Sequence, residues 1–403
     1  MSLNLTDIAS QVAGMAANFK QNNQKTQQQL LKAMAICIDC SNDLEWLKRK
    51  AVTSKTSWLI AQPVEKPNCH YPSPQPPDEF SIIATDGSQI DVDRHLSVRC
   101  YIINIGSVIL KYGSNPDAII SSLPSLYSGD RDLVIVSPDG RGREQLVEGT
   151  LLGIKRSVEE CKQLASIAAG VPIGNSALAL IDGSLILWNL VSKEYPEFVI
   201  EDLLNRGFIR CLDKIKKLNK DRKVAVASYI SFPRSTDVIN TLRVAICHHE
   251  IPDCDRYCSK IVTGNRECDA VTGIRDRDLF SRLLANGERS ALFTSQSSIV
   301  EKWYGNHRIY FFYLRADDEV ARIEIPEWVV ADKHLLNLTH GLLLDQCRRG
   351  HGYPVALAEA HQQAVVTSAD RENFQRLIEM VLVEENLQLT TSAKNRSKKT
   401  RWI

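Results

Sequence analysis

The sequence lacks a long apolar run and a leader-like beginning. No apolar stretch approaches the ~18 residues that a membrane-spanning helix needs, and the best candidate, residues 177–191, is interrupted by Asp182, Gly183 and Ser184. The first ten residues, MSLNLTDIAS, have neither the basic start nor the apolar stretch of a signal peptide. We therefore expect a cytoplasmic protein that has no membrane partner.

The sequence also lacks an excess of charge of either sign. Lys and Arg number 49 against 48 Asp and Glu, which leaves a net charge of +1. This balance excludes a strongly basic chain, but a local basic groove is enough to bind nucleic acid. The odd number of cysteines, 11, argues against a disulfide framework.

Four segments of different character divide the chain. Residues 1–62 are amphipathic with a helical repeat and predict a helical hairpin. Residues 63–79 begin PVEKPNCHYPSPQPP, which excludes a helix or a central strand and predicts a linker. Residues 80–386 hold every chemical motif and form the expected main domain, with a cysteine-bearing insert at about 247–300. Residues 387–403 are basic, without an apolar pattern, and are expected to be a disordered tail.

Strand-like and helix-like patterns mix in the main domain, which predicts an α/β fold. Short apolar strands are expected at residues 80–84, 177–181 and 224–230, and a hairpin at residues 309–325. A long charged helix is expected over residues 141–169, and mainly helix from residue 332 onward.

Two Asp-Gly-Ser sequences, which begin at Asp86 and Asp182, follow strongly apolar strands. An aspartate that comes just after a buried strand is held rigidly at the edge of the sheet, and the glycine lets the backbone turn. Each copy alone is a common turn or cap sequence. Two copies on neighbouring strands would present carboxylate oxygens, the ligands that hard divalent cations prefer.

A glutamate from the expected helix would complete a carboxylate triad, which is typical of the metal site of ribonuclease-H-like nucleases. The candidates are Glu144, Glu148, Glu159 and Glu160. Glu160 shares a helix face with Arg156 and Leu164, so its side chain is the one most favoured to point inward.

A third motif lies near the C-terminus, where Gly352-Tyr353-Pro354 precedes a segment that contains His361. Pro354 suits the first turn of a helix, which places Tyr353 at the helix start and His361 about two turns later. An imidazole near a metal site can ligate the ion, orient water or move a proton.

The order of these motifs, strand-TDGS, charged helix, strand-IDGSL and then GYPVALAEAHQQA, resembles the NurA nuclease family over roughly residues 80–385. These DNA-end-resection nucleases work beside the HerA translocase. The resemblance implies a ribonuclease-H-like mixed sheet flanked by helices, here with an N-terminal helical extension. It also implies cleavage of single-stranded DNA and duplex ends with Mn²⁺, Mg²⁺ being possible, in a ring-like homodimer that partners a HerA-type hexameric translocase.

The resemblance assigns the catalytic residues Asp86, Glu160, Asp182, Tyr353 and His361. Of these, it implies that Asp86, Glu160, Asp182 and His361 are metal ligands. Glu159 is the nearest alternative to Glu160, and Glu148 is a more remote one. Arg234, at the end of an expected strand, is a candidate DNA phosphate contact.

Four cysteines, Cys247, Cys254, Cys258 and Cys268, lie with two histidines within residues 247–268. Thiolates and imidazoles at this density can hold zinc or an iron–sulfur cluster. Their spacing matches no standard C-x2-C knuckle, which favours scattered thiols in an insertion and leaves metal binding open.

Two other function classes remain as alternatives. The first is a catalytically inactive ribonuclease-H-like scaffold that docks a DNA translocase, and loss of the helix glutamate would favour it. The second is a sugar-kinase-like ATPase, but the sequence has no P-loop-type glycine loop to cradle phosphates. The expected hairpin at residues 309–325 and the N-terminal helices are both candidate dimer surfaces.

Overall fold

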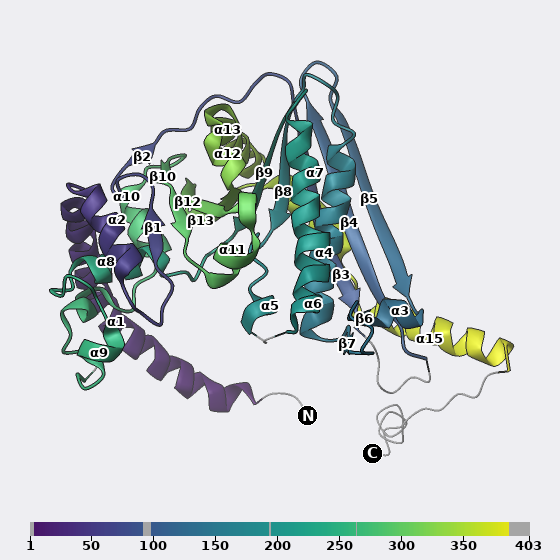
Figure 1. Cartoon of the computed structure of the whole chain (residues 1–403), viewed down its shortest axis with the longest axis horizontal. Helices are drawn as coiled ribbons and strands as arrows, with labels where there is room; N and C mark the ends of the chain where they lie inside the picture. Colours follow the sequence, from purple (N-terminus) through teal and green to yellow (C-terminus); the bar gives the residue numbers. More distant parts are fainter. Residues whose placement is uncertain (1–3, 92–97, 193–194, 263, 387–403) are drawn as a thin grey trace. The chain divides into compact units, whose positions relative to one another are not determined.

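The structure, a computed structural model, describes residues 4–91, 98–192, 195–262 and 264–386. These residues form two compact units (Figure 1). Unit 1 comprises the described residues of Met1–Ser73, Ile230–Ser298 and Tyr310–Ile323, and unit 2 those of Pro74–Tyr229, Ile299–Ile309 and Glu324–Ile403. The expected basic tail, residues 387–403, lies outside the described residues. Within those residues, no helix is both long and apolar enough to cross a membrane.

Unit 1 begins with the expected N-terminal helices, α1 (Leu5–Cys40) and α2 (Leu44–Thr53). Helix α1 continues through the Gln/Asn-rich stretch because glutamine is a good helix former and no proline interrupts it. Asn4 and Asp43 cap the two helices by accepting hydrogen bonds from the backbone N–H groups of Thr6 and Trp46. Of the residues 1–62 that were expected to be helical, those from Leu5 to Cys40 and from Leu44 to Thr53 form helices.

The other elements of unit 1 are short helices and mostly short strands. The helices are α8 (Asp237–Ala245), α9 (Cys254–Cys258), the 3-10 helix η2 (Glu267–Val271) and α10 (Asp276–Leu283). The strands are β1 (Ala61–Pro63), β2 (His70–Tyr71), β10 (Arg289–Ser290), β11 (Phe293–Ser295) and most of β12 (Ile309–Ala316) and β13 (Glu319–Pro326), whose residues Ile309 and 324–326 belong to unit 2. The helices share a core with these strands that includes Leu30, Leu242, Phe280 and Phe311.

The hairpin expected at residues 309–325 is confirmed as β12 and β13, but its side chains are mostly buried. It therefore offers little free surface for a dimer contact. Helix α1, in contrast, exposes large apolar side chains such as Val12 and Met15.

Unit 2 is built on a mixed sheet whose strands lie in the order β9, β8, β3, β4, β5. Its strands are β3 (Phe80–Ile90), β4 (Tyr101–Tyr112), β5 (Asp117–Tyr127), β8 (Ser176–Asp182) and β9 (Lys223–Ile230). Strands β3, β4 and β5 form an antiparallel meander, whereas β8 pairs in parallel with both β3 and β9. The predicted α/β class, with a mixed sheet flanked by helices and an N-terminal helical extension, is confirmed.

Strand β3 is longer than the sequence suggested. It was expected to end before the first Asp-Gly-Ser motif, but it runs through the motif to Ile90 because Asp86 and Gly87 stay paired with Gly106 and Ile105 of β4. Asp86 therefore lies inside a strand rather than in a turn. The second motif behaves as expected, since β8 ends at Asp182 and Gly183 follows with a φ of 87°.

The charged helix is shorter than expected. Helix α4 spans Thr150–Ala168, and the residues before it form α3 (Asp130–Leu133) and a hairpin of β6 (Val134–Val136) and β7 (Glu144–Leu146). Gly149, directly before α4, has a φ of 56°, a left-handed conformation that glycine adopts readily and that cannot continue a helix.

Helices cover both faces of this sheet. Helix α4 packs against β3 and β4 on one face (Figure 1), and α14 (Val355–Ala364) packs against the same two strands. Successive side chains of a strand point to opposite faces of the sheet. A Cβ atom on Gly87 would meet α4, whereas one on Gly106, which pairs with the preceding residue Asp86, would meet α14. The two helices therefore lie on opposite faces.

The remaining helices of unit 2 complete its layers. They are α5 (Asn189–Ser192), α6 (Glu197–Ile200), the π-helix η1 (Glu201–Ile209), α7 (Arg210–Leu218), the 3-10 helix η3 (Gly305–His307), α12 (Glu327–Ala331), α13 (Lys333–Arg349) and α15 (Ser368–Glu384). Helix α11 (Ser298–Trp303) begins at the last residue of the second segment of unit 1. The helical C-terminal region expected from residue 332 is confirmed, with its break between α13 and α14.

Candidate active site

The parallel pairing of β3 with β8 brings the two motif aspartates together. Thr85 pairs with Ile181, so Asp86 and Asp182 are the next residues in register on neighbouring strands. Pairing with β8 stops there, whereas β3 continues along β4 to Ile90. The two carboxylates therefore stand where the parallel part of the sheet ends, about one strand spacing (~4.8 Å) apart in the backbone.

Glu160 of helix α4 is the candidate glutamate whose pKa the charges of both aspartates raise. Its side chain is only 6% exposed, and Arg156 Nε lies 3.1 Å from its Oε1, one helical turn earlier. Arg156 Nε and Glu160 Oε1 form an ion pair, but their geometry is not that of a hydrogen bond. Glu160 Oε1 is therefore a buried oxygen without a hydrogen-bond donor in the described part of the chain. Thr85 anchors this turn of the helix by donating its hydroxyl to the carbonyl oxygen of Glu160 at 3.1 Å.

Gly87 leaves the space that Glu160 occupies. A Cβ atom at this position would collide with Glu160 Oε1 and lie 2.9 Å from Cγ of Arg156. The glycine of the first motif is therefore required by the close approach of a side chain, and it makes no turn.

His361 approaches Asp86 from the opposite face of the sheet. Its Nδ1 lies 2.7 Å from Asp86 Oδ2, within hydrogen-bonding distance. The close packing of α14 on β4 depends on Gly106, where a Cβ would clash with the backbone of Ala360. Asn104 of the same strand also holds the end of α14 by donating to the carbonyl oxygen of Gln363 at 3.0 Å.

Tyr353 approaches Asp182. Its hydroxyl hydrogen-bonds the Asp182 carboxylate, an interaction that opposes the rise of the pKa of that group. The Tyr353 ring meets Tyr229 edge-on, with 5.4 Å between ring centroids, and Tyr229 is the residue that pairs with Asp182 in the sheet. The Tyr353 ring is thus positioned by packing while its hydroxyl faces the acidic centre.

The three carboxylates share a crowded electrostatic environment. Burial above all, and then the charges of Asp86 and Asp182, raise the pKa of Glu160 from its ordinary 4.5 to about 7, against the lowering effect of Arg156. Burial and then Asp86 also raise the pKa of Asp182. Carboxylates placed together in this way disfavour each other's ionised form, and a bound cation would relieve the repulsion.

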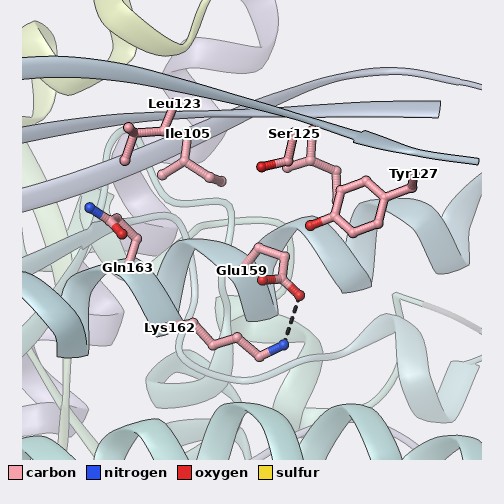
Figure 2. A pocket seen from close by; sticks show the side chains of 8 residues that line it. Ile105, Leu123, Ser125, Tyr127, Glu159, Lys162 and Gln163 are labelled. Atoms are coloured by element: carbon pink, nitrogen blue, oxygen red, sulfur yellow. Dashed lines mark hydrogen bonds and ion pairs between the residues drawn. The ribbon is translucent and has the colours of Figure 1, made fainter. Parts of the chain in front are cut away.

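The other candidate glutamates lie elsewhere. Figure 2 shows Glu159 in a pocket that Ile105, Leu123 and Tyr127 also line, where it makes an ion pair of 2.7 Å with Lys162. Glu144 lies in strand β7 and Glu148 precedes α4, so neither is on the helix that was expected to carry them. Arg234 is exposed and belongs to unit 1.

The donor chemistry of Asp86, Glu160, Asp182 and His361 fits a divalent cation of the Mg²⁺ or Mn²⁺ type. The described residues form no ready-made cage, since no three Asp, Glu, His or Cys side chains are placed to hold an ion as they stand. A catalytic ion of this type usually keeps several waters and completes its shell with substrate phosphate, so it does not require a closed cage of protein ligands. The buried Glu160 Oε1, which lacks a hydrogen-bond donor in the described chain, is the oxygen most in need of such a partner.

The sequence did not reveal two structural supports of the site. One is Gly106, whose position inside a strand pattern is a known sign of close backbone approach. The other is Glu324, which is buried and accepts hydrogen bonds from Ser184 Oγ at 2.7 Å and the backbone N–H of Leu185 at 3.0 Å. Glu324 thereby fixes the loop after Asp182, and no local pattern in the sequence links the two segments.

Comparison with known proteins gives a family match and weak structural similarities. The sequence model of the NurA domain matches residues 80–366. A structure described as "Crystal structure of NurA with manganese" is similar at 12% sequence identity and a TM-score of 0.38, over 77% of this chain and 91% of that chain. The foamy virus protease-reverse transcriptase has 13% identity and a TM-score of 0.21, over 38% of this chain and 18% of that chain. No curated protein sequence matches significantly.

Proposed function

Because the chain belongs to the NurA domain family, a family of nucleases, we propose that it is a metal-dependent deoxyribonuclease that hydrolyses phosphodiester bonds. Its substrates would be single-stranded DNA and duplex ends, which it would cut as an endonuclease and an exonuclease. The observation that carries the proposal is that Asp86 and Asp182 follow directly on the last residues that pair two neighbouring strands with each other. They are near enough to the buried Glu160 for their charges, together with burial, to raise its pKa to about 7.

In the proposed site, Asp86, Glu160, Asp182 and His361 would hold the cation, Mn²⁺ or Mg²⁺. When bound, the cation supplies charge for the phosphate and lowers the pKa of a bound water. His361 lies within hydrogen-bonding distance of Asp86, so its imidazole can orient that carboxylate or carry a proton during hydrolysis. Tyr353 fixes Asp182 through its hydroxyl and can contact water or phosphate beside it.

Arg234 remains a proposed phosphate contact, since it is exposed and a guanidinium is well suited to a DNA backbone. A homodimer, a HerA-type hexameric translocase, a role in end resection during double-strand break repair and a cytoplasmic location are also proposed, from the family. The edge strand β5 supports a protein contact, because it exposes large apolar side chains, as sheet edges that pair with partners do: Ile119, Ile120, Leu123 and Leu126.

The direct test is cleavage of an end-labelled single-stranded oligonucleotide by the full-length protein with Mn²⁺, with Mg²⁺ or with a chelator. We expect cleavage with Mn²⁺, weaker cleavage with Mg²⁺ and none with the chelator. The chelated sample should recover when Mn²⁺ is added in excess, which separates metal removal from denaturation. Equal cleavage with and without the chelator would refute a metal-dependent mechanism, and no cleavage under any condition would favour the inactive scaffold.

A further inference from the structure

Four cysteines of unit 1 line a single cavity: Cys247, Cys254, Cys258 and Cys268. Cys247 follows α8, Cys254 and Cys258 are the first and last residues of α9, and Cys268 lies in η2. Burial, and then the neighbouring Cys258, Cys268 and Cys247, raise the pKa of Cys254. Thiols from three separate elements therefore converge on one place, although their sequence spacing fits no standard knuckle.

The segment that carries these cysteines has little core of its own. Between α8 and α10, the regular structure of the described residues is limited to α9 and η2, of five residues each. Its buried large apolar side chains are Val271 and Ile274, whereas Ile251 and Val262 are 52% and 72% exposed. Segments of this kind are usually stabilised by a metal or by disulfides, and all of the chain's cysteines are free thiols.

Two cations stand beside the cavity, and in the described part of the chain neither lies within ion-pair distance of a carboxylate. Lys50 is buried, and its ammonium donates to the backbone carbonyl oxygens of Ala245 and Cys247. Arg243 donates to Cys268 Sγ at 3.9 Å and stacks over the Trp58 ring at 3.8 Å. Within the described residues neither makes an ion pair with a carboxylate, although burial of an unpaired cation is costly. An anionic group in the cavity would supply the missing partner.

Histidine is a poor candidate for a ligand here. His249 lines the cavity, but its ring stacks on Tyr257 with 3.8 Å between centroids. His248 lies 3.1 Å from Glu267 Oε2 through its Nδ1. The cysteine thiols are thus the donors that remain.

The arrangement fits a polynuclear centre better than one zinc ion. A structural zinc needs four sulfur or nitrogen ligands around one point, and among the described residues no group of three or more Asp, Glu, His or Cys side chains is placed to hold an ion. In a [4Fe–4S] cluster each thiolate binds a different iron atom, so the four cysteine sulfurs stay farther apart than around a single ion. Such clusters take four cysteine thiolates and accept hydrogen bonds at sulfur, as Arg243 offers to Cys268.

We propose that Cys247, Cys254, Cys258 and Cys268 ligate an iron–sulfur cluster that ties α8, α9 and η2 together. The bound thiolates are the anionic partners of Lys50 and Arg243. The cluster's role is structural and is independent of the nuclease site in unit 2, so the two proposals succeed or fail separately.

The test is metal analysis of the full-length protein, purified without oxygen and then reconstituted with ferrous iron and sulfide. We expect bound iron and acid-labile sulfide in equal amounts, with visible absorption from thiolate-to-iron charge transfer. Removal of the cluster with a chelator should lower the melting temperature by several degrees. Zinc without iron, or no bound iron after reconstitution, would overturn the proposal.

Substitution identifies the ligands. Cys254→Ser and Cys258→Ser should each lower the bound iron several-fold, because each removes one of four ligands. Cys69→Ser is the matched control, since Cys69 is also a half-buried thiol of unit 1 but does not line the cavity, and it should bind iron like the wild type. Circular dichroism must show unchanged helix content, and a folded Cys258→Ser protein with wild-type iron would contradict the assignment.

Discussion

Replacement of Asp86 by asparagine is expected to lower DNA cleavage about a thousandfold, which corresponds to about 4 kcal/mol of transition-state stabilisation. The amide has the size of the carboxylate but no charge, so it removes a carboxylate oxygen of the proposed metal site and the anionic partner that lies 2.7 Å from His361. The measurement is the initial rate of oligonucleotide cleavage at saturating Mn²⁺.

The control for this substitution is Asp117→Asn. Asp117 belongs to the same sheet, but it is an exposed residue of β5 that pairs with Lys111 at 2.9 Å. Its variant should cleave at the wild-type rate. An Asp86→Asn protein that retains more than about a tenth of the wild-type rate would show that Asp86 is not at the reacting centre.

Replacement of Glu160 by glutamine is expected to abolish cleavage and yet to stabilise the metal-free protein near neutral pH. Burial holds the pKa of Glu160 at about 7 rather than 4.5, so the folded state binds more protons than the unfolded state between these values. Its contribution to the free energy of unfolding therefore falls as the pH rises from about 4.5 to about 7. A pKa shift of this size corresponds to a loss of roughly 3 kcal/mol in the free energy of unfolding above pH 7. Glutamine does not ionise, so the variant is not destabilised in this way.

The measurement is the melting temperature of the chelated wild type and Glu160→Gln variant at pH 5.5 and pH 7.5. The variant should melt at a higher temperature at pH 7.5, and the difference should be smaller at pH 5.5. Asp276 is another buried carboxyl, in unit 1, with a pKa of about 6. It is present in both proteins, so its effect on the melting temperature cancels when the two proteins are compared at the same pH. Glu159→Gln is the matched control, because its ion pair with Lys162 lies at the surface. A difference that does not depend on pH would contradict the burial of an ionisable Glu160.

The sequence was sufficient to predict the fold class and to select five candidate residues that interact with one another in the structure. Apolar runs before Asp86 and Asp182 marked two strands, and these two strands are neighbours in the structure. The helical spacing that sets Arg156 and Glu160 on one face also separated Glu160 from Glu159, which points to a different pocket. Periodicity succeeded here because each inference depended on local geometry alone.

The errors arose where tertiary contacts override local signals. Asp-Gly-Ser is a common turn sequence, but pairing with β4 keeps Gly87 in a strand and Glu160 fills the space beside it. The long charged helix was predicted to begin before Gly149, because the stretch is polar and the left-handed backbone of that glycine is not visible in a hydrophobic pattern. The support that Glu324 gives to Leu185 joins residues far apart in the chain, which no periodicity can predict.

Binding of Mn²⁺ to the isolated protein, followed by electron paramagnetic resonance, tests most directly whether Asp86, Glu160 and Asp182 form one metal site. We predict saturable binding by the wild type in the absence of DNA, and at least a tenfold loss of affinity in each of the variants Asp86→Asn, Glu160→Gln and Asp182→Asn. Asp117→Asn should bind as the wild type does. Binding that is equally tight in all of the variants would contradict the shared site and, with it, the proposed mechanism.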